Sequence, residues 1–295
     1  MTESAGRRNV DLHTHTSASD GTDTPEELVR KVAELGLVAV AVTDHDTISG
    51  LDEACVAGKR YGVAVVRGCE LAVGSRFGEL HILGLWLSPK PSAVTEALAG
   101  IREGRDARNR EMVDRFRAAG YDVCYEELLA MAKGESVARP HMARLLVTKG
   151  ICVSVSEAFS RFLGTNKPMA VPRVLPSPEE VFTLLRSAGA TTVFAHPMLV
   201  RAPYDWLRAT TSEFVDMGLD AVEAYHPDHD AKAVRKAEKL ARYHGLALSG
   251  GSDYHGDARP ETLLGRGSGG SALSYSLLEG LLACRKRKNQ PLYMD

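Results

Sequence analysis

The chain has few cysteines, almost no net charge and no long hydrophobic run. Its 295 residues include five cysteines, an odd number without CxxC spacing, which argues against a disulfide framework or a zinc knuckle. A formal net charge of −2 gives no overall field that favours nucleic acid or a membrane. No stretch approaches the roughly 20 apolar residues of a bilayer span, and the start lacks a secretory signal pattern. We therefore expect a soluble, cytoplasmic protein without an obligate protein partner.

Seven short β-forming runs contain a histidine or a carboxylate near one end. They read VDLHTH, AVAVTDHD, AVVRGCE, LHILGLWL, TTVFAHP, AVEAYHP and LALSGGSDYH. Helix-like segments lie between them, and one of these has Thr24 as N-cap, Pro25 in the first turn and Gly36 at its end. The helix-like segments are 24–36, 177–189, 230–245 and 271–289. This alternation predicts a βα barrel or a doubly wound sheet, in which the carboxyl ends of parallel strands gather on one face.

Two regions depart from the alternation. Within residues 70–87, the segment VGSRFGE separates two strands by too few residues for a helical crossover, which predicts an antiparallel hairpin and a distorted barrel. Residues 91–175 are mainly helical and contain the loop GTNKP. We therefore predict an α/β barrel made of residues 8–90 and 176–290, with an inserted helical subdomain at 91–175.

Histidines and carboxylates recur at the strand ends in a pattern that suits metal ions. His13 and His15 alternate along a strand and so share one face. Glu70 ends an apolar strand, where a buried carboxylate needs a cation, either a metal ion or an arginine. A turn, a helix cap or a core position explains each such residue alone, but the joint pattern indicates a metal centre. The residues are His13, His15, Asp20, His45, Glu70, His81, His196, Asp253 and His255.

These ligands are too many for a single ion. One ion takes about four to six ligands, so nine nitrogen and oxygen donors imply two or three divalent ions. Imidazole-rich sites suit manganese, iron or zinc, and we expect manganese. Clustered divalent ions lower the pKa of a bridging water and clamp a phosphoryl group, which predicts phosphoester hydrolysis.

In order along residues 10–255, the motifs HTH, TDHD, GCE, AHP and GSDYH, with Asp20 and His81, resemble the PHP (polymerase and histidinol phosphatase) family. The resemblance implies a distorted (β/α)7 barrel, the PHP fold, with all nine residues in the catalytic site. The implied ligands of a first ion are His13, His15, Glu70 and Asp253. Glu70 would bridge to a second ion, whose other implied ligands are His81 and His196. The implied ligands of a third ion are Asp20, His45 and His255.

The inserted segment carries basic residues where apolar ones are expected. In residues 100–120, the stripe of Phe116 and Met112 continues backward at helical spacing through Asn109, Arg105 and Arg102. A phosphate-binding face is one interpretation, and a solvated helix end is the other.

Further basic candidates lie in the second half of the insertion. Arg139 and His141 flank Pro140 at a predicted helix start, where free amides and the helix dipole favour an anion. Lys167 lies in the GTNKP loop. The candidate substrate-binding residues are therefore Arg102, Arg105, Arg139, His141 and Lys167.

The basic segments resemble the PHP subgroup that includes 3′,5′-nucleotide bisphosphate phosphatases and 5′-3′ exoribonucleases. This implies that the insertion grips a 5′-phosphate while a metal-bridging hydroxide attacks a 3′-phosphoester. We expect a nucleoside 3′,5′-bisphosphate substrate, such as pAp converted to AMP and phosphate. The alternatives are a 5′-3′ exoribonuclease on 5′-phosphorylated short RNA, a histidinol phosphate phosphatase and a non-catalytic metal-stabilised module. The roles of Glu223, His226 and His229 stay open.

Overall fold

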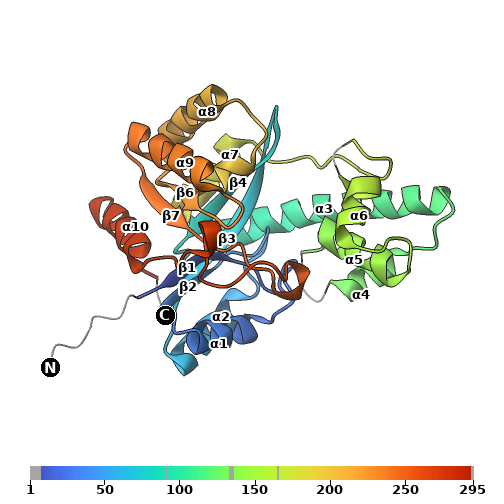
Figure 1. Ribbon diagram of the computed structural model, residues 1–295, viewed down its shortest axis with the longest axis horizontal. Helices are drawn as coiled ribbons and strands as arrows, with labels where there is room; N and C mark the ends of the chain where they lie inside the picture. Colours follow the sequence, from blue (N-terminus) through green and yellow to red (C-terminus); the bar gives the residue numbers. More distant parts are fainter. Residues whose placement is uncertain (1–7, 91, 133–135, 165, 294–295) are drawn as a thin grey trace.

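The computed structural model describes residues 8–90, 92–132, 136–164 and 166–293. Residue 91, the predicted start of the insertion, lies outside them. Seven strands form one sheet whose spatial order follows the chain. They are β1 Val10–Thr14, β2 Ala39–Val42, β3 Ala64–Ser75, β4 Gly78–Leu85, β5 Thr191–Ala195, β6 Ala221–Tyr225 and β7 Ala247–Gly250. Figure 1 shows the helices of both chain halves packed around this sheet.

The sheet curls until its two edges meet. Just beyond β7, the Asp253 N–H donates to the carbonyl of His13 at 2.9 Å, and the His15 N–H donates to the carbonyl of Tyr254 at 2.9 Å. All neighbouring strands are parallel except β4, which is antiparallel to both β3 and β5. The predicted distorted (β/α)7 barrel and its hairpin are therefore confirmed, although the hairpin strands are longer than the sequence suggested.

Helices with strong end signals cover the barrel. Thr24 and Glu27 form a reciprocal capping box at the start of α1, and Ser177 and Glu180 form one at the start of α7. The predicted helix at 271–289 is wrong at its start, because Leu273 pairs with Val10 of β1 and Ser274 caps the helix. The helices are α1 Pro25–Glu34, α2 Leu51–Tyr61, α7 Pro178–Ser187, α8 Tyr204–Met217, α9 Ala231–His244 and α10 Tyr275–Arg287.

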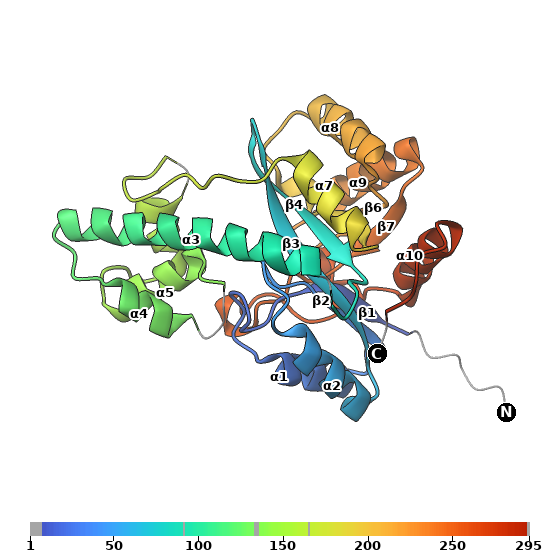
Figure 2. The same ribbon diagram turned by 180° about the vertical axis from the view of Figure 1, so that it is seen from behind.

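The helices between β4 and α7 stand to one side of the barrel. Figure 2 shows α3 running from the barrel to the far end of this group. Met112, Phe116, Leu146 and Leu163 belong to a hydrophobic core of its own. The helices are α3 Ser92–Ala118, α4 Tyr125–Met131, α5 Arg139–Thr148 and α6 Val155–Ala158, followed by the π-helical turn Phe159–Leu163. No helix in the described ranges has both the length and the hydropathy of a membrane span.

Candidate metal centre and arginine pocket

Glu70 lies at the middle of a buried group of imidazoles. Its Oε2 is 3.2 Å from Nε2 of His13, 3.2 Å from Nε2 of His15 and 3.1 Å from Nδ1 of His45. Its Oε1 is 2.8 Å from Nδ1 of His81 and 3.1 Å from Nε2 of His196. Glu70 is itself fully buried on β3. One carboxylate thus contacts five side chains from four segments of the chain.

Asp253 completes the group that was predicted for the first ion. Its Oδ1 lies 3.2 Å from Nε2 of His15 and 3.5 Å from Nε2 of His13. One ligand atom from each of His13, His15, Glu70 and Asp253 falls within 4.8 Å of the others. The backbone of Asp253 has a φ of 52°, and that of His196 has a φ of 28°. Such left-handed conformations in residues other than glycine are held by their surroundings and are concentrated at functional sites.

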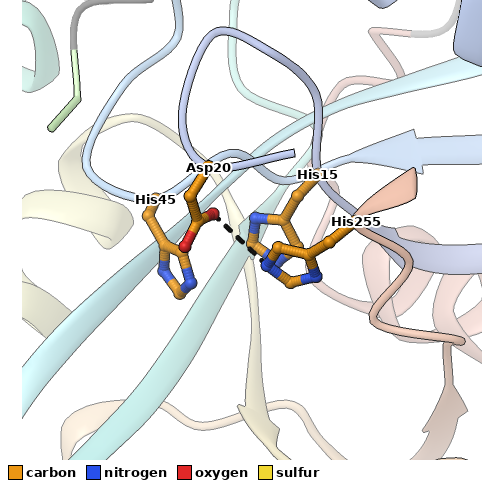
Figure 3. Close-up of side chains that lie close together, drawn as sticks. All are labelled: His15, Asp20, His45 and His255. Atoms are coloured by element: carbon orange, nitrogen blue, oxygen red, sulfur yellow. Dashed lines mark ion pairs between the residues drawn. The ribbon is translucent and has the colours of Figure 1, made fainter. Parts of the chain in front are cut away.

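A second group of possible metal ligands shares His15 with the first group. Figure 3 shows the side chains of His15, Asp20, His45 and His255 turned toward one another from three loops. Asp20 Oδ1 is 3.3 Å from Nε2 of His255, and the rings of His15 and His255 stack with their centroids 4.2 Å apart. The structure thus brings all nine predicted ligands into one cluster, which we call the nine-residue cluster. That these residues bind metal ions stays a prediction.

The donor atoms of the cluster fit shared cations better than hydrogen bonds. Nε2 of His13, both ring nitrogens of His15 and Oε2 of Glu70 are buried without a hydrogen-bond partner. Burial lowers the pKa of His15, but the adjacent carboxylates of Asp253 and Glu70 outweigh it and raise that pKa to about 9. Burial likewise opposes the effect of Glu70 on His81, whose pKa rises to about 10. The buried carboxylates are therefore stabilised by positive charge at this site, and divalent ions would supply that charge.

Glu223 on β6 orients two members of the cluster. Its Oε1 is 3.1 Å from Nδ1 of His13, and its Oε2 accepts the backbone N–H of His196 at 2.8 Å. The contact between Glu223 and Nδ1 leaves Nε2 of His13 facing Glu70, as in carboxylate–histidine–metal arrangements. His13, His196 and Glu223 also have ligand atoms within 4.8 Å of one another.

His226 and His229, whose roles the sequence left open, have different contacts. Nδ1 of His226 accepts the backbone N–H of Asp228 at 3.1 Å, and its Nε2 lies 3.4 Å from Oδ2 of Asp253. Both nitrogens of His226 are therefore engaged, and it holds Asp253 from behind. His229 uses Nδ1 on the carbonyl of Ala224 at 2.9 Å, and its buried Nε2 has no partner.

An arginine-lined cavity of about 700 Å³ lies beside the cluster. Its walls include Arg108, Arg139, Arg173 and Arg201, opposed by Glu79, and we call it the arginine pocket. Glu79 Oε2 is 3.5 Å from Nη2 of Arg139 and 3.9 Å from Nε2 of the cluster residue His81. The pocket therefore shares a wall with the candidate metal centre.

Two of these arginines are buried with unused donors. Arg108 is 6% exposed, and its Nε has no partner. The side chain of Arg173 is 5% exposed, and its Nε and Nη2 have none. Burial, with the positive charges of Arg105, Arg139 and Arg173, lowers the pKa of Arg108 to about 9. Buried guanidinium groups that repel one another and keep donors without acceptors have the chemistry to bind an anion.

The predicted substrate-binding residues do not all meet in this pocket. Arg139 lines it, whereas Arg105 donates from Nε to Oδ2 of Asp46 at 2.6 Å. Arg102 is half-buried, and its Nη1 lies 3.4 Å from the Asp46 carbonyl. His141 is buried in the first turn of α5, as predicted for a helix start. Lys167 is exposed and is not among the residues that line the pocket.

The sequence interpretation missed Arg108 and Arg173. Arg108 carries a readable signal, because it precedes the buried Met112 by four residues on the same helix face. Arg173 lies in an irregular segment with no periodicity, and only the tertiary fold brings it to the pocket.

Comparisons with known proteins agree with this geometry. A family model described as PHP domain matches residues 11–166. The 5′-3′ exoribonuclease Rnm of Salmonella typhimurium is 33% identical, covering 83% of this chain and 84% of its own. The 3′,5′-nucleoside bisphosphate phosphatase of Chromobacterium violaceum is 33% identical, covering 84% of this chain and 87% of its own. An amidohydrolase structure from Chromobacterium violaceum, with bound sulfate and no metal, is 30% identical with a TM-score of 0.85, covering 94% of this chain and 96% of that one.

Proposed function

The chain belongs to the PHP domain family, and we propose that it removes the 3′-phosphate from nucleoside 3′,5′-bisphosphates. The broader activity, hydrolysis of phosphoesters, is common to the exoribonuclease and the bisphosphate phosphatase named above. The observation that supports the narrower proposal is the arginine pocket beside the candidate metal centre, with Glu79 next to both. A substrate with two phosphates would occupy both.

The candidate metal centre and the arginine pocket would each bind one phosphate of the substrate. Divalent ions held by the nine-residue cluster, for which we propose manganese, would neutralise the scissile phosphoryl group and lower the pKa of a coordinated water. Glu223 fixes the ring of His13, and His226 fixes the carboxylate of Asp253. Arg108, Arg139 and Arg173 would hold the second phosphate through charge-assisted hydrogen bonds. Binding energy from that remote phosphate would position the 3′-phosphoester for attack.

A 5′-3′ exoribonuclease on 5′-phosphorylated short RNA is the second candidate. One observation favours it: at about 700 Å³ the arginine pocket is larger than one phosphate requires, and Phe77 and Leu199 expose 37% and 41% of their surface there. Exposed apolar and aromatic side chains beside a basic groove suit nucleobases. A histidinol phosphate carries a single phosphate and would leave the arginine pocket unused.

Phosphate or nucleotide release from a substrate panel tests the proposal. The manganese-loaded protein would be given a nucleoside 3′,5′-bisphosphate, the matching 3′-monophosphate, a short 5′-phosphorylated RNA and histidinol phosphate. We expect the highest kcat/KM for the bisphosphate. A higher value for RNA would establish the exoribonuclease instead, and no turnover of any compound by metal-loaded protein would indicate a non-catalytic module.

A pocket variant tests the second phosphate directly. Arg139→Gln should lower kcat/KM for the bisphosphate by about tenfold or more, since a charge-assisted hydrogen bond is worth roughly 1.5–3 kcal/mol. The matched control is Arg161→Gln, because Arg161 pairs with Glu157 on the surface of the same helical group and does not line the pocket. If Arg139→Gln lowered turnover of the mono- and bisphosphate equally, the assignment of the pocket to the second phosphate would be wrong.

A further inference from the structure

Asp46 connects the nine-residue cluster to the arginine pocket. It directly follows the cluster residue His45, and its N–H donates to the carbonyl of Glu70 at 3.1 Å. Its backbone has a φ of 52°, a left-handed conformation that is uncommon in residues other than glycine. The side chain is 1% exposed. A buried carboxylate is thus attached to the backbone of two candidate metal ligands.

The same carboxylate contacts both chain segments that join the helical group to the barrel. Arg105, on the outgoing helix α3, donates from Nε to Oδ2 at 2.6 Å. Arg173, on the segment that returns toward α7, donates from Nη1 to the same oxygen at 2.8 Å. The two arginines lie 68 residues apart in sequence and donate to the same oxygen atom. Asp46 therefore holds the outgoing and returning segments together at the edge of the metal site.

The junction places one buried carboxylate against two guanidinium groups. The pairing uses only part of Arg173, whose Nε and Nη2 are buried without a partner while the residue lines the arginine pocket. Asp46 thus fixes one edge of a guanidinium whose remaining donors are available to an anion.

We propose that Asp46 is a positioning residue that sets the spacing between the arginine pocket and the nine-residue cluster, and thereby selects substrates with two phosphates over substrates with one. The proposal rests on the proposed function for its substrate. Its physical basis is geometric: remote binding energy aids the reaction only while the two sites keep the separation of the two phosphates.

Asp46→Asn is the suitable variant. Asparagine adopts positive φ almost as readily as aspartate, so the backbone turn beside His45 is retained. Asparagine keeps one acceptor oxygen, but the negative charge that pairs with both Arg105 and Arg173 is lost. We expect the ratio of kcat/KM for the 3′,5′-bisphosphate to that for the 3′-monophosphate to fall about tenfold or more, chiefly through KM for the bisphosphate. Arg173→Gln should change the ratio in the same direction.

Asp52→Asn is the matched control. Asp52 lies six residues along the chain on α2 and pairs with Arg67 at 2.7 Å, so the chemical change is the same without a contact to the helical group. We expect the control to leave the ratio within about twofold of the wild type. A ratio in Asp46→Asn equal to that of the wild type would overturn the proposal. If both values of kcat/KM fell equally, Asp46 would act only through His45.

Hydrogen exchange separates this inference from the proposed function. In Asp46→Asn, amides of residues 102–109 and 170–176 should exchange several-fold faster than in the wild type, while those of α9 stay unchanged. If neither nucleotide is hydrolysed by the wild type but both segments loosen in the variant, the proposed function fails and the spacing role of Asp46 is retained. If the segments do not loosen, the spacing role fails whatever the activity.

Discussion

His141 is a buried histidine that the structure keeps neutral. Its Nδ1 accepts the backbone N–H of Ala138 at 2.9 Å, which completes the first turn of α5. Burial is the main reason that its pKa is lowered to about 4, and the charges of Arg144 and Arg105 add to the effect against that of Asp20. With Nδ1 accepting, the proton of the neutral ring is on Nε2. At this position His141 therefore offers a hydrogen-bond donor without a positive charge.

The lowered pKa of His141 predicts a dependence of stability on pH. The unfolded histidine, with a pKa near 6.5, binds a proton that the folded one refuses down to about 4. The contribution of His141 is therefore fully present above pH 6.5 and is lost as the pH falls toward 4. Between pH 7 and pH 5 we expect a loss of about 2 kcal/mol in the free energy of unfolding from this residue.

Urea unfolding of wild type and His141→Gln at both pH values measures this loss. Glutamine can accept from the Ala138 N–H as in an ordinary capping box, but it does not titrate. Because all other titrations are common to both proteins, the wild type should lose about 2 kcal/mol more than the variant. Equal losses would show that His141 titrates normally in the folded state, and a smaller loss in the wild type than in the variant would show that it is already protonated there.

At the scale of elements, the closure of the barrel between β1 and β7 depends on a glycine. A Cβ on Gly251 would lie 2.1 Å from the Cβ of His13 and 2.6 Å from its backbone nitrogen. The backbone of β1 cannot move aside without displacing His13 and His15. Gly251→Ala should therefore destabilise the protein by about 3 kcal/mol or more, at the upper end for overpacking, and weaken manganese binding. Thermal unfolding and metal titration of the variant measure both effects.

Gly100 provides the contrasting substitution. It lies within α3, is exposed, and an added Cβ would meet nothing within 4 Å. Gly100→Ala should stabilise the protein by roughly 0.5–1 kcal/mol, because alanine loses less backbone entropy in a helix. If Gly251→Ala were tolerated as well as Gly100→Ala, the close approach of β7 to β1 would be wrong.

The elements show why much of the site was predictable. His15 and His196 directly follow apolar strands, and parallel strands bring such ends together whatever lies between them in sequence. Glu70 was also predicted at a strand end, but it lies inside β3, because that strand continues to Ser75 as part of the antiparallel hairpin. The antiparallel β4 was also predictable, because its connection to β3 is too short for a crossover. The chemistry of the metal cluster thus follows from short local patterns, and its order in the chain carries the family resemblance.

The arginine pocket was less predictable, for a physical reason. Arg105 follows a helical period and was expected on a packed face, but its partner Asp46 belongs to a loop whose left-handed turn no pattern reveals. Arg173 comes from an irregular segment placed by the packing of the helices around it. The start of α10 failed similarly, because pairing of Leu273 with β1 overrides the helix propensity of the residues before Ser274.

At the scale of the whole molecule, we expect metal binding to change the stability of the two hydrophobic cores differently. The barrel core includes Val40, Leu71 and Phe194, whereas the helical group packs around Phe116 and Leu146. The nine-residue cluster lies on strands of the barrel and on the loops that follow them. Its buried carboxylates are stabilised by positive charge, so bound ions should stabilise the barrel more than the helical group.

Chelation provides the test of this difference. At manganese concentrations 100-fold above the dissociation constant, binding stabilises a folded unit by about 2.7 kcal/mol per site. Removal of the metal with a chelator should therefore lower the midpoint temperature of barrel unfolding by several degrees. Hydrogen exchange of the amides of β1 and β3 measures this midpoint. Amides of α5, within the second core, should keep their protection until higher temperature. Simultaneous loss of protection in β3 and α5 would mean that the junction at Asp46 couples the two cores into one cooperative unit, and the metal would then stabilise both equally.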